Sequence, residues 1–285
     1  MPVRHTHRRT LLVAAAALLS CTLVVEVAQA DPIASIDSAA DATVVAVRGA
    51  ATQVEQPALP PDHSGCLKGT GTRVSAAIDP AQRWLIDIQD TTWRYWKISF
   101  YPQPGVRGAV AVVGDSLTVA STEETMRELI DAGYGPICID AQVARRVSVY
   151  TSALPSGVQE IARIKSSDAV WRLETVRWVI ALGTNDTRAD ISNYSTTIQK
   201  GRDAVGAVTV PIYWIDVRTR LGAPYTTYEN AWNERLPGPN IVVVGWAAAV
   251  ASSPSTYINN TDLIHLTSAG EVLRGQITRA ALVAS

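Results

Sequence analysis

Histidine, cysteine and long apolar segments are all scarce in this chain of 285 residues, which holds four histidines and three cysteines. Two of the histidines and Cys21 fall within the first thirty residues. The rest of the chain keeps two histidines and two cysteines, and no cysteines are clustered, so there is little from which to build a metal site. We expect neither a metal ion nor another cofactor.

An excess of charge of one sign is also absent, since the formal net charge is −1. Without the first thirty residues, which hold three Arg and one Glu, 22 basic residues face 25 acidic ones and the net charge is −3. Such a chain has no electrostatic attraction for nucleic acid or for an anionic membrane surface. Beyond the N-terminal leader no stretch is long and apolar enough to span a bilayer. We therefore expect no nucleic-acid partner and no integral membrane segment in the mature chain.

Residues 1–30 have the pattern of a cleavable signal peptide. A basic start with three arginines precedes the apolar stretch Leu11–Val25, and the small-residue sequence Ala28–Ala30 precedes Asp31. This leader predicts a secreted, extracellular protein.

Two variants of this export route are left open. His7–Leu12 fits a loose twin-arginine pattern. Lipid attachment at Cys21 is a weaker alternative, because the preceding Leu19 is bulky for such a site.

Residues 31–107 read as an N-terminal extension. Its first part is rich in Ala, Pro, Gly, Ser and Thr and suggests a linker or surface wrap, whereas residues 83–101 concentrate aromatic side chains. Trp96, Ile98 and Phe100 recur at every second position, as on one face of a strand. Packing against the core is favoured over a role as an aromatic wall of a substrate groove.

From Gly108 to the C-terminus, apolar runs alternate with helical patterns. The runs are continuous rather than alternating, which is typical of parallel strands covered on both faces. They cover residues 109–113, 136–139, 178–182, 210–217 and 241–246. We expect residues 108–285 to form one α/β domain with a doubly wound, five-stranded parallel sheet sandwiched by helices.

Three short motifs follow the first, third and fifth runs: Gly114–Leu117, Gly183–Asp186 and Asp262–His265. Each alone would be a turn or a helix-entry loop. The carboxyl ends of parallel strands share one edge of a sheet, where such folds bind ligands. A serine, an amide, a carboxylate and an imidazole are therefore expected at one place.

Those side chains supply the parts of serine-based acyl chemistry. Ser116 needs a base within hydrogen-bond reach, and only His63 and His265 remain after the leader. His63 lies in a Pro-, Ser- and Gly-rich stretch that reads as a surface loop, so His265 is the candidate base. Asp262, three residues earlier, can hold the useful imidazole tautomer.

A developing oxyanion needs fixed hydrogen-bond donors. The side-chain amide of Asn185 can supply one, and the backbone N–H of Ser116 can supply another at the start of a helix. A third donor is expected from the loop after the second run, residues 140–146.

Over residues 108–285 the chain resembles the SGNH or GDSL family of serine esterases and acyltransferases. The resemblance implies a flavodoxin-like SGNH hydrolase fold, with Ser116 as nucleophile, His265 as base, Asp262 as its partner and Asn185 as an oxyanion donor. The second family block departs, because residues 140–146 lack the glycine whose N–H enters the oxyanion hole.

Ala144, or alternatively Ala141, can supply that missing N–H, although the backbone angles of alanine are more restricted than those of glycine. The 140–146 loop is similar to that of secreted SGNH domains related to cell-wall O-acetyltransferases.

Three functions follow from these features. The first is a secreted serine ester hydrolase acting on short acyl esters of small molecules or glycans. The second is an O-acyltransferase that passes the acyl group to a sugar hydroxyl of the cell wall. The third is a catalytically silent cell-wall binding module. The absence of a membrane acyl-donor domain favours hydrolysis, and nothing in the sequence indicates the oligomeric state.

Cys66 and Cys138 form an even pair in an oxidising compartment. They can form a disulfide that links the N-terminal segment to the main domain. The alternative is two separate thiols, with Cys138 buried in a strand as a small apolar residue.

Overall fold

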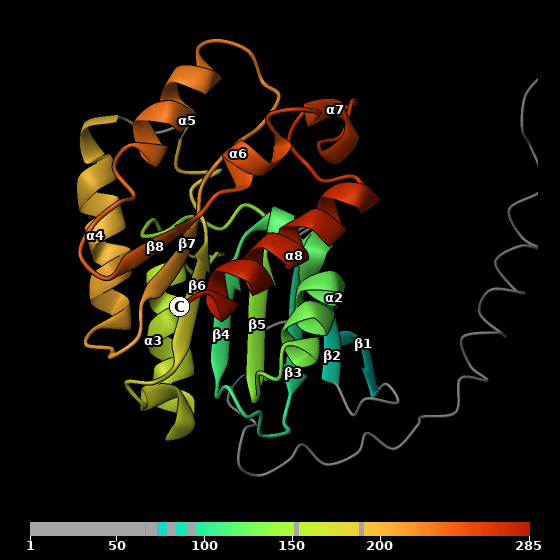
Figure 1. The fold of residues 1–285 in the computed structure, drawn as a ribbon, viewed down its shortest axis with the longest axis vertical. Coiled ribbons are helices and arrows are strands. Elements are labelled where there is room, and N and C mark those ends of the chain that lie inside the picture. Colours follow the sequence, from blue (N-terminus) through green and yellow to red (C-terminus); the bar gives the residue numbers. More distant parts are fainter. Residues whose placement is uncertain (1–65, 67–72, 79–83, 90–94, 151–153, 188–190) are drawn as a thin grey trace, which may run out of the picture. The chain divides into compact units, whose positions relative to one another are not determined.

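A mixed β-sheet of eight strands runs through the part of the chain that the structure describes, in the order β1-β2-β3-β5-β4-β6-β7-β8 (Figure 1). The structure is a computed structural model, and all of its described residues belong to one compact unit, Gln56–Ser285. The described residues are 66, 73–78, 84–89, 95–150, 154–187 and 191–285. The predicted signal peptide, with Cys21 and the arginine motif, and the His63 loop lie outside them.

Five of these strands are parallel and form one continuous part of the sheet. In spatial order they are β5 (Ile137–Gln142), β4 (Val110–Gly114), β6 (Arg177–Ala181), β7 (Ile212–Ile215) and β8 (Ile241–Val244). All five residues of β4 are buried. A strand covered on both faces has no solvent face for polar side chains, which explains its uninterrupted apolar sequence.

Three antiparallel strands extend the sheet beyond β5: β1 (Arg73–Ile78), β2 (Trp84–Gln89) and β3 (Tyr95–Tyr101). The α/β class is confirmed, but the expectation of a five-stranded, all-parallel sheet is corrected to a mixed sheet. The physical reason is that β3 pairs with the free edge of β5, β2 pairs with β3, and β1 pairs with β2. The predicted boundary at residue 108 thus falls between two strands of one sheet.

The alternation at Trp96, Ile98 and Phe100 is confirmed as one face of β3. These side chains are 8%, 2% and 0% exposed, and they belong to the same core cluster as Trp178. Packing, rather than a solvent-facing aromatic wall, is therefore their role.

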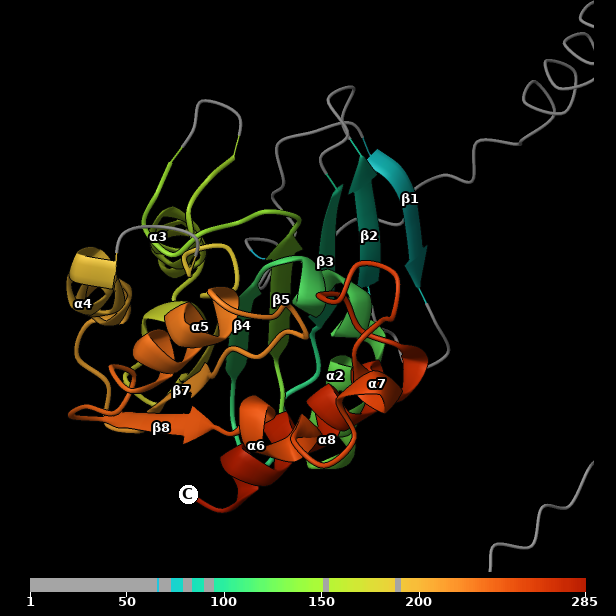
Figure 2. The same ribbon diagram turned by 90° about the horizontal axis from the view of Figure 1, so that it is seen from above.

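Helices cover both faces of the sheet (Figure 2). Ala111 and Val113 of β4 face a core shared with α3 (Gly157–Ser167) and α4 (Tyr194–Val205). Val110 and Val112 face the opposite core, shared with the neighbouring helices α2 and α8. The bounds of the other helices are α2 (Ser116–Asp131), α5 (Tyr225–Asn233), α6 (Trp246–Val250), α7 (Pro254–Tyr257), α8 (Ser268–Val283), η2 (Val170–Arg172) and η3 (Ile191–Asn193).

The structure joins Cys66 to Cys138 of β5 in a disulfide, with 5.7 Å between the Cα atoms. The disulfide hypothesis is confirmed over that of two separate thiols. Both residues are fully buried. Within the described ranges, none of the helices has the length and apolarity that crossing a bilayer requires.

We expect the double variant Cys66→Ala, Cys138→Ala to lose about 4 kcal/mol of unfolding free energy, because the bond restricts the unfolded chain over a 72-residue separation. Urea denaturation followed by tryptophan fluorescence measures this loss. Wild-type protein denatured with a reductant should show the same loss. Equal stability of the variant and the non-reduced wild type would contradict the cross-link.

Candidate active site

Ser116 begins helix α2 directly after strand β4. A Cβ atom on Gly114 would lie 2.0 Å from the Thr118 hydroxyl oxygen, so this tight strand-to-helix turn requires glycine. The Asp115 side chain caps the helix by accepting a hydrogen bond from the Leu117 N–H at 3.0 Å. Ser116 thus occupies the first helical position, where a backbone N–H has no partner within the helix.

The structure brings Ser116, His265 and Asp262 together. His265 Nε2 lies 3.0 Å from Ser116 Oγ, and His265 Nδ1 lies 2.8 Å from Asp262 Oδ2. These two contacts form one chain of hydrogen bonds from carboxylate to hydroxyl. With Nδ1 donating to Asp262, Nε2 is left as the acceptor for the serine proton.

The Asp262–His265 turn is itself held by the carboxylate. Asp262 Oδ1 accepts hydrogen bonds from the backbone N–H groups of Ile264 and His265, each at 2.9 Å. Leu263 has a φ of 62°, a left-handed conformation that is strained for leucine. Such strain persists only where surrounding contacts hold the backbone in place. Here the two hydrogen bonds to Asp262 Oδ1 hold it, and they fix the separation between Asp262 and the imidazole.

The Asp262 carboxylate is ionised at neutral pH. Partial burial opposes ionisation, but the Ile264 and His265 N–H groups and the His265 imidazole lower the pKa of Asp262 to about 2. A negative charge at this position can stabilise an imidazolium on His265.

Asn185 lies in the loop after β6. Gly183 at the start of this loop has a φ of 137°, and a Cβ there would meet the Trp232 ring at 2.6 Å. Asn185 Nδ2 donates a hydrogen bond to the backbone carbonyl of Arg145, 3.1 Å away. This contact connects Asn185 to the loop after β5.

Ala144 lies in a turn closed by a hydrogen bond from the Arg145 N–H to the Gln142 carbonyl at 3.2 Å. Its φ is 62°, in the left-handed region that glycine adopts without strain. The alternative, Ala141, is buried within β5. Ala144 therefore occupies the backbone conformation that the missing glycine would favour.

Two buried charged residues of this loop region, Arg145 and Asp186, had no role predicted from the sequence. Arg145 is 1% exposed, and its guanidinium bonds to the backbone carbonyls of Gly114 and Asp140. Asp186 accepts from the Val147 N–H at 3.1 Å and lies 3.6 Å from the Arg146 guanidinium. The available sequence signal was two adjacent arginines at a strand end, with an aspartate preceding them and another in the next motif.

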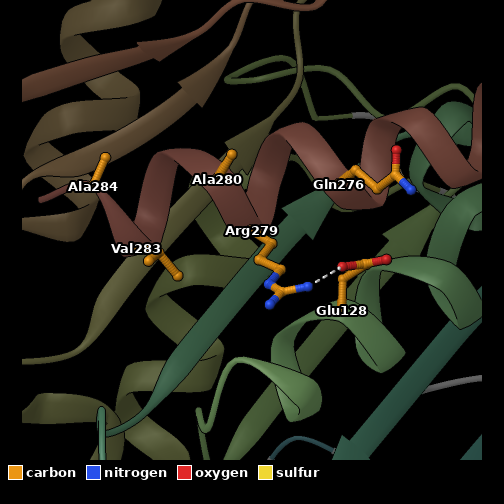
Figure 3. Close-up of a pocket in the computed structure, with 6 residues that line it drawn as sticks. All are labelled: Glu128, Gln276, Arg279, Ala280, Val283 and Ala284. Carbon is orange, nitrogen blue, oxygen red and sulfur yellow. Dashed lines mark hydrogen bonds and ion pairs between the residues drawn. The ribbon is translucent and has the colours of Figure 1, made fainter.

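No described trio of His, Cys, Asp or Glu side chains is gathered as metal ligands would be. A cavity of about 440 Å³ lies elsewhere, between α2 and α8, where Glu128 pairs with Arg279 at 3.1 Å (Figure 3). Glu128 is twelve residues beyond Ser116, which is about 18 Å along a helix. The cavity is therefore separate from the serine. It is lined by Glu128, Gln276, Arg279, Ala280, Val283 and Ala284.

No protein-family model and no curated protein sequence matches the chain. Among solved structures, it is similar to the C-terminal catalytic domain of Streptococcus pneumoniae peptidoglycan O-acetyltransferase A, at 18% identity and a TM-score of 0.47, over 62% of this chain and 93% of that one.

It is also similar to an acetyl xylan esterase from Geobacillus stearothermophilus, at 13% identity and a TM-score of 0.47, over 63% and 96%. A lipase from a goat rumen metagenome matches at 17% identity and a TM-score of 0.42, over 61% and 96%.

The neighbours named here thus comprise an O-acetyltransferase domain, an acetyl xylan esterase and a lipase.

Asp186 makes the stability of this region depend on pH. Burial raises the pKa of Asp186 from 3.8 to about 7, against the opposing effects of the Val147 N–H and Arg146. The unfolded chain ionises near pH 3.8 and the folded chain only near pH 7. Stability from this group is therefore complete below pH 3.8 and is lost as the pH rises through 7.

We expect Asp186→Asn to gain stability relative to wild type between pH 4 and pH 8, by at most about 4 kcal/mol. Urea denaturation across this range measures the difference. Asp203→Asn removes an exposed carboxylate and is the control for the substitution itself, with stability expected within about 0.5 kcal/mol of wild type. Parallel profiles for Asp186→Asn and wild type would contradict the assignment.

Proposed function

We propose that this chain is a secreted serine ester hydrolase that acts on short acyl esters of small molecules or glycans through an acyl-enzyme. The observation that carries this proposal is the hydrogen-bonded chain Asp262–His265–Ser116, with 2.8 Å and 3.0 Å between successive polar atoms. A serine hydroxyl becomes nucleophilic when a positioned base can take its proton, and this arrangement supplies one. Secretion is inferred from the predicted signal peptide, residues 1–30.

In the first half-reaction, Ser116 Oγ attacks the ester carbonyl carbon while His265 Nε2 takes the hydroxyl proton. The tetrahedral intermediate then collapses, the bond to the leaving alcohol breaks, and the imidazolium returns its proton to that alcohol. Asp262 keeps the ring oriented and stabilises its charge during this step. The product is an acyl group on Ser116.

The carbonyl oxygen carries negative charge in the tetrahedral intermediate, and three N–H groups are assigned to it. The Ser116 N–H is at the positive end of α2, which favours an anion. Asn185 Nδ2 uses one hydrogen on the Arg145 carbonyl and has a second for the oxyanion. The Ala144 N–H takes the place of the family's glycine.

In the second half-reaction a nucleophile attacks the acyl carbon while His265 Nε2 takes its proton. The bond from the acyl carbon to Ser116 Oγ then breaks, and the imidazolium returns a proton to Ser116 Oγ. The side chains of His265 and Asp262 are 45% and 42% exposed. Water therefore reaches the imidazole from bulk solvent, and this openness favours hydrolysis over transfer to a sugar hydroxyl.

We expect Ser116→Ala to lower kcat for acetyl ester hydrolysis by about 10⁴-fold or more, because the covalent route is removed. Release of nitrophenol from nitrophenyl acetate, and of acetate from acetylated sugars, measures the loss. The exposed Ser166→Ala on α3 is the matched control and should keep wild-type rates. Near-full activity in Ser116→Ala would show that another group is the nucleophile.

For the second half-reaction we expect free acid as the main product even when a cell-wall oligosaccharide is offered as acceptor. Mass spectrometry of the oligosaccharide, together with acetate quantification, separates the two outcomes. Acetylated oligosaccharide formed faster than free acetate would identify the chain as a transferase. That result would agree with the acyl-enzyme and would contradict only the assignment of water as the acceptor.

A further inference from the structure

Arg145 contacts the ends of two strands through its buried side chain. One guanidinium nitrogen, Nη1, donates to the carbonyl of Gly114 at 3.2 Å and to the carbonyl of Asp140 at 2.8 Å. Gly114 is the last residue of β4, two positions before Ser116. The side chain therefore connects the turn that carries the serine to strand β5.

The backbone of Arg145 contacts the third strand end. Its carbonyl accepts a hydrogen bond from Asn185 Nδ2 at 3.1 Å. A carbonyl can only accept, so this contact fixes the Asn185 side chain with its nitrogen, not its oxygen, toward the loop after β5. An inverted amide would present an acceptor to the oxyanion and repel it.

The same residue closes the turn that contains Ala144. The Arg145 N–H bonds to the Gln142 carbonyl at 3.2 Å, and the guanidinium holds the strand from which this turn leaves. Ala144 adopts a φ of 62° within that turn. A non-glycine residue in this region needs surrounding contacts that fix it, and the anchored Arg145 provides them.

The charge of Arg145 is balanced inside the protein. A second guanidinium nitrogen, Nη2, lies 2.7 Å from Asp140 Oδ1, while Arg163 bonds to Asp140 Oδ2 at 2.6 Å. Burial opposes ionisation of Asp140, but the positive charges of Arg145 and Arg163 hold the pKa of this carboxyl below its usual range. The planar guanidinium of Arg145 donates to several acceptors at once. The single ammonium group of a lysine could not reach as many of them.

We propose that Arg145 is a positioning residue that sets the geometry of the Asn185 and Ala144 oxyanion donors relative to Ser116. This inference rests on the proposed function, since it concerns the donors of that reaction. Arg145 does not touch the ester itself. It acts through the Asn185 amide, the Ala144 turn and the Gly114 carbonyl.

The test compares Arg145→Lys with the double variant Asp140→Asn, Arg145→Gln. The lysine keeps the positive charge beside Asp140, and the double variant removes both charges together, so neither leaves an unpaired buried charge. In each we expect kcat for nitrophenyl acetate to fall by about 100-fold with KM nearly unchanged, as for the loss of an oxyanion donor.

Arg163→Met is the matched control. Arg163 shares the Asp140 carboxylate with Arg145 and also pairs with Glu160 at 2.5 Å. Its loss should reduce thermal stability and leave kcat within a few-fold of wild type. A merely structural role of Arg145 would give the same pattern as Arg163.

A double-mutant cycle with Asn185→Ala measures the coupling between the two residues in kcat. A loss of stability alone would not produce such coupling. If Arg145 acts through Asn185, the combined variant Asn185→Ala, Arg145→Lys should lose much less than the product of the two single losses in kcat. If the loss in kcat of the combined variant equals the product of the two single losses, Arg145 does not act through Asn185.

The result that overturns the proposal is a wild-type kcat in both folded Arg145 variants, with folding checked by circular dichroism and thermal unfolding. Failure of the proposed function gives a different result, in which wild type and Ser116→Ala release acid at equal rates.

Discussion

The parallel register around Gly114 is the constraint on which the rest of the site depends. Gly114 pairs with Ala141 on β5 and with Ala181 on β6, so the three strands end at the same level. Ser116, Ala144 and Asn185 follow these residues by two, three and four positions. Every loop that carries an expected donor or nucleophile therefore leaves the sheet from one short edge, and each needs only a tight turn to reach the others.

Buried charge holds these turns after the sheet has placed them. Arg145 pairs with Asp140 beneath the second loop, and Asp186 lies against Arg146 beneath the third. Beneath the serine, burial raises the pKa of Asp115, an effect that the positive charge of Arg274 opposes. Each ionic group costs desolvation energy that an apolar side chain would not. A protein that needed only a stable core would gain little from them, so we interpret them as fixing the loop positions.

Much of this arrangement could be predicted from the sequence, because its signals are local. The apolar runs identify the parallel strands, and the scarcity of histidine leaves His265 as the candidate partner of Ser116. The alternation of apolar residues at Trp96, Ile98 and Phe100 likewise predicts strand β3. The mixed sheet was missed because pairing β3 with β5 is a contact between segments about 40 residues apart, which no local pattern encodes.

The role inferred for Arg145 was invisible for a related reason. The two partners that connect it to the other strand ends are a backbone carbonyl 31 residues earlier and a side-chain amide 40 residues later. Backbone carbonyls look alike in every sequence, so a bond to one leaves no signature. The left-handed Ala144 is hidden in the same way, since alanine gives no hint of a positive φ where glycine would.

In the proposed mechanism, His265 activates Ser116 as the nucleophile within the folded chain. The most direct measurement is peptide mass spectrometry after treatment of the folded protein with a fluorophosphonate probe. We expect a single adduct on Ser116 in wild type, and a labelling rate reduced by about 10³-fold or more in His265→Gln. Ester hydrolysis with no adduct on Ser116, or equal labelling of wild type and His265→Gln, would contradict it.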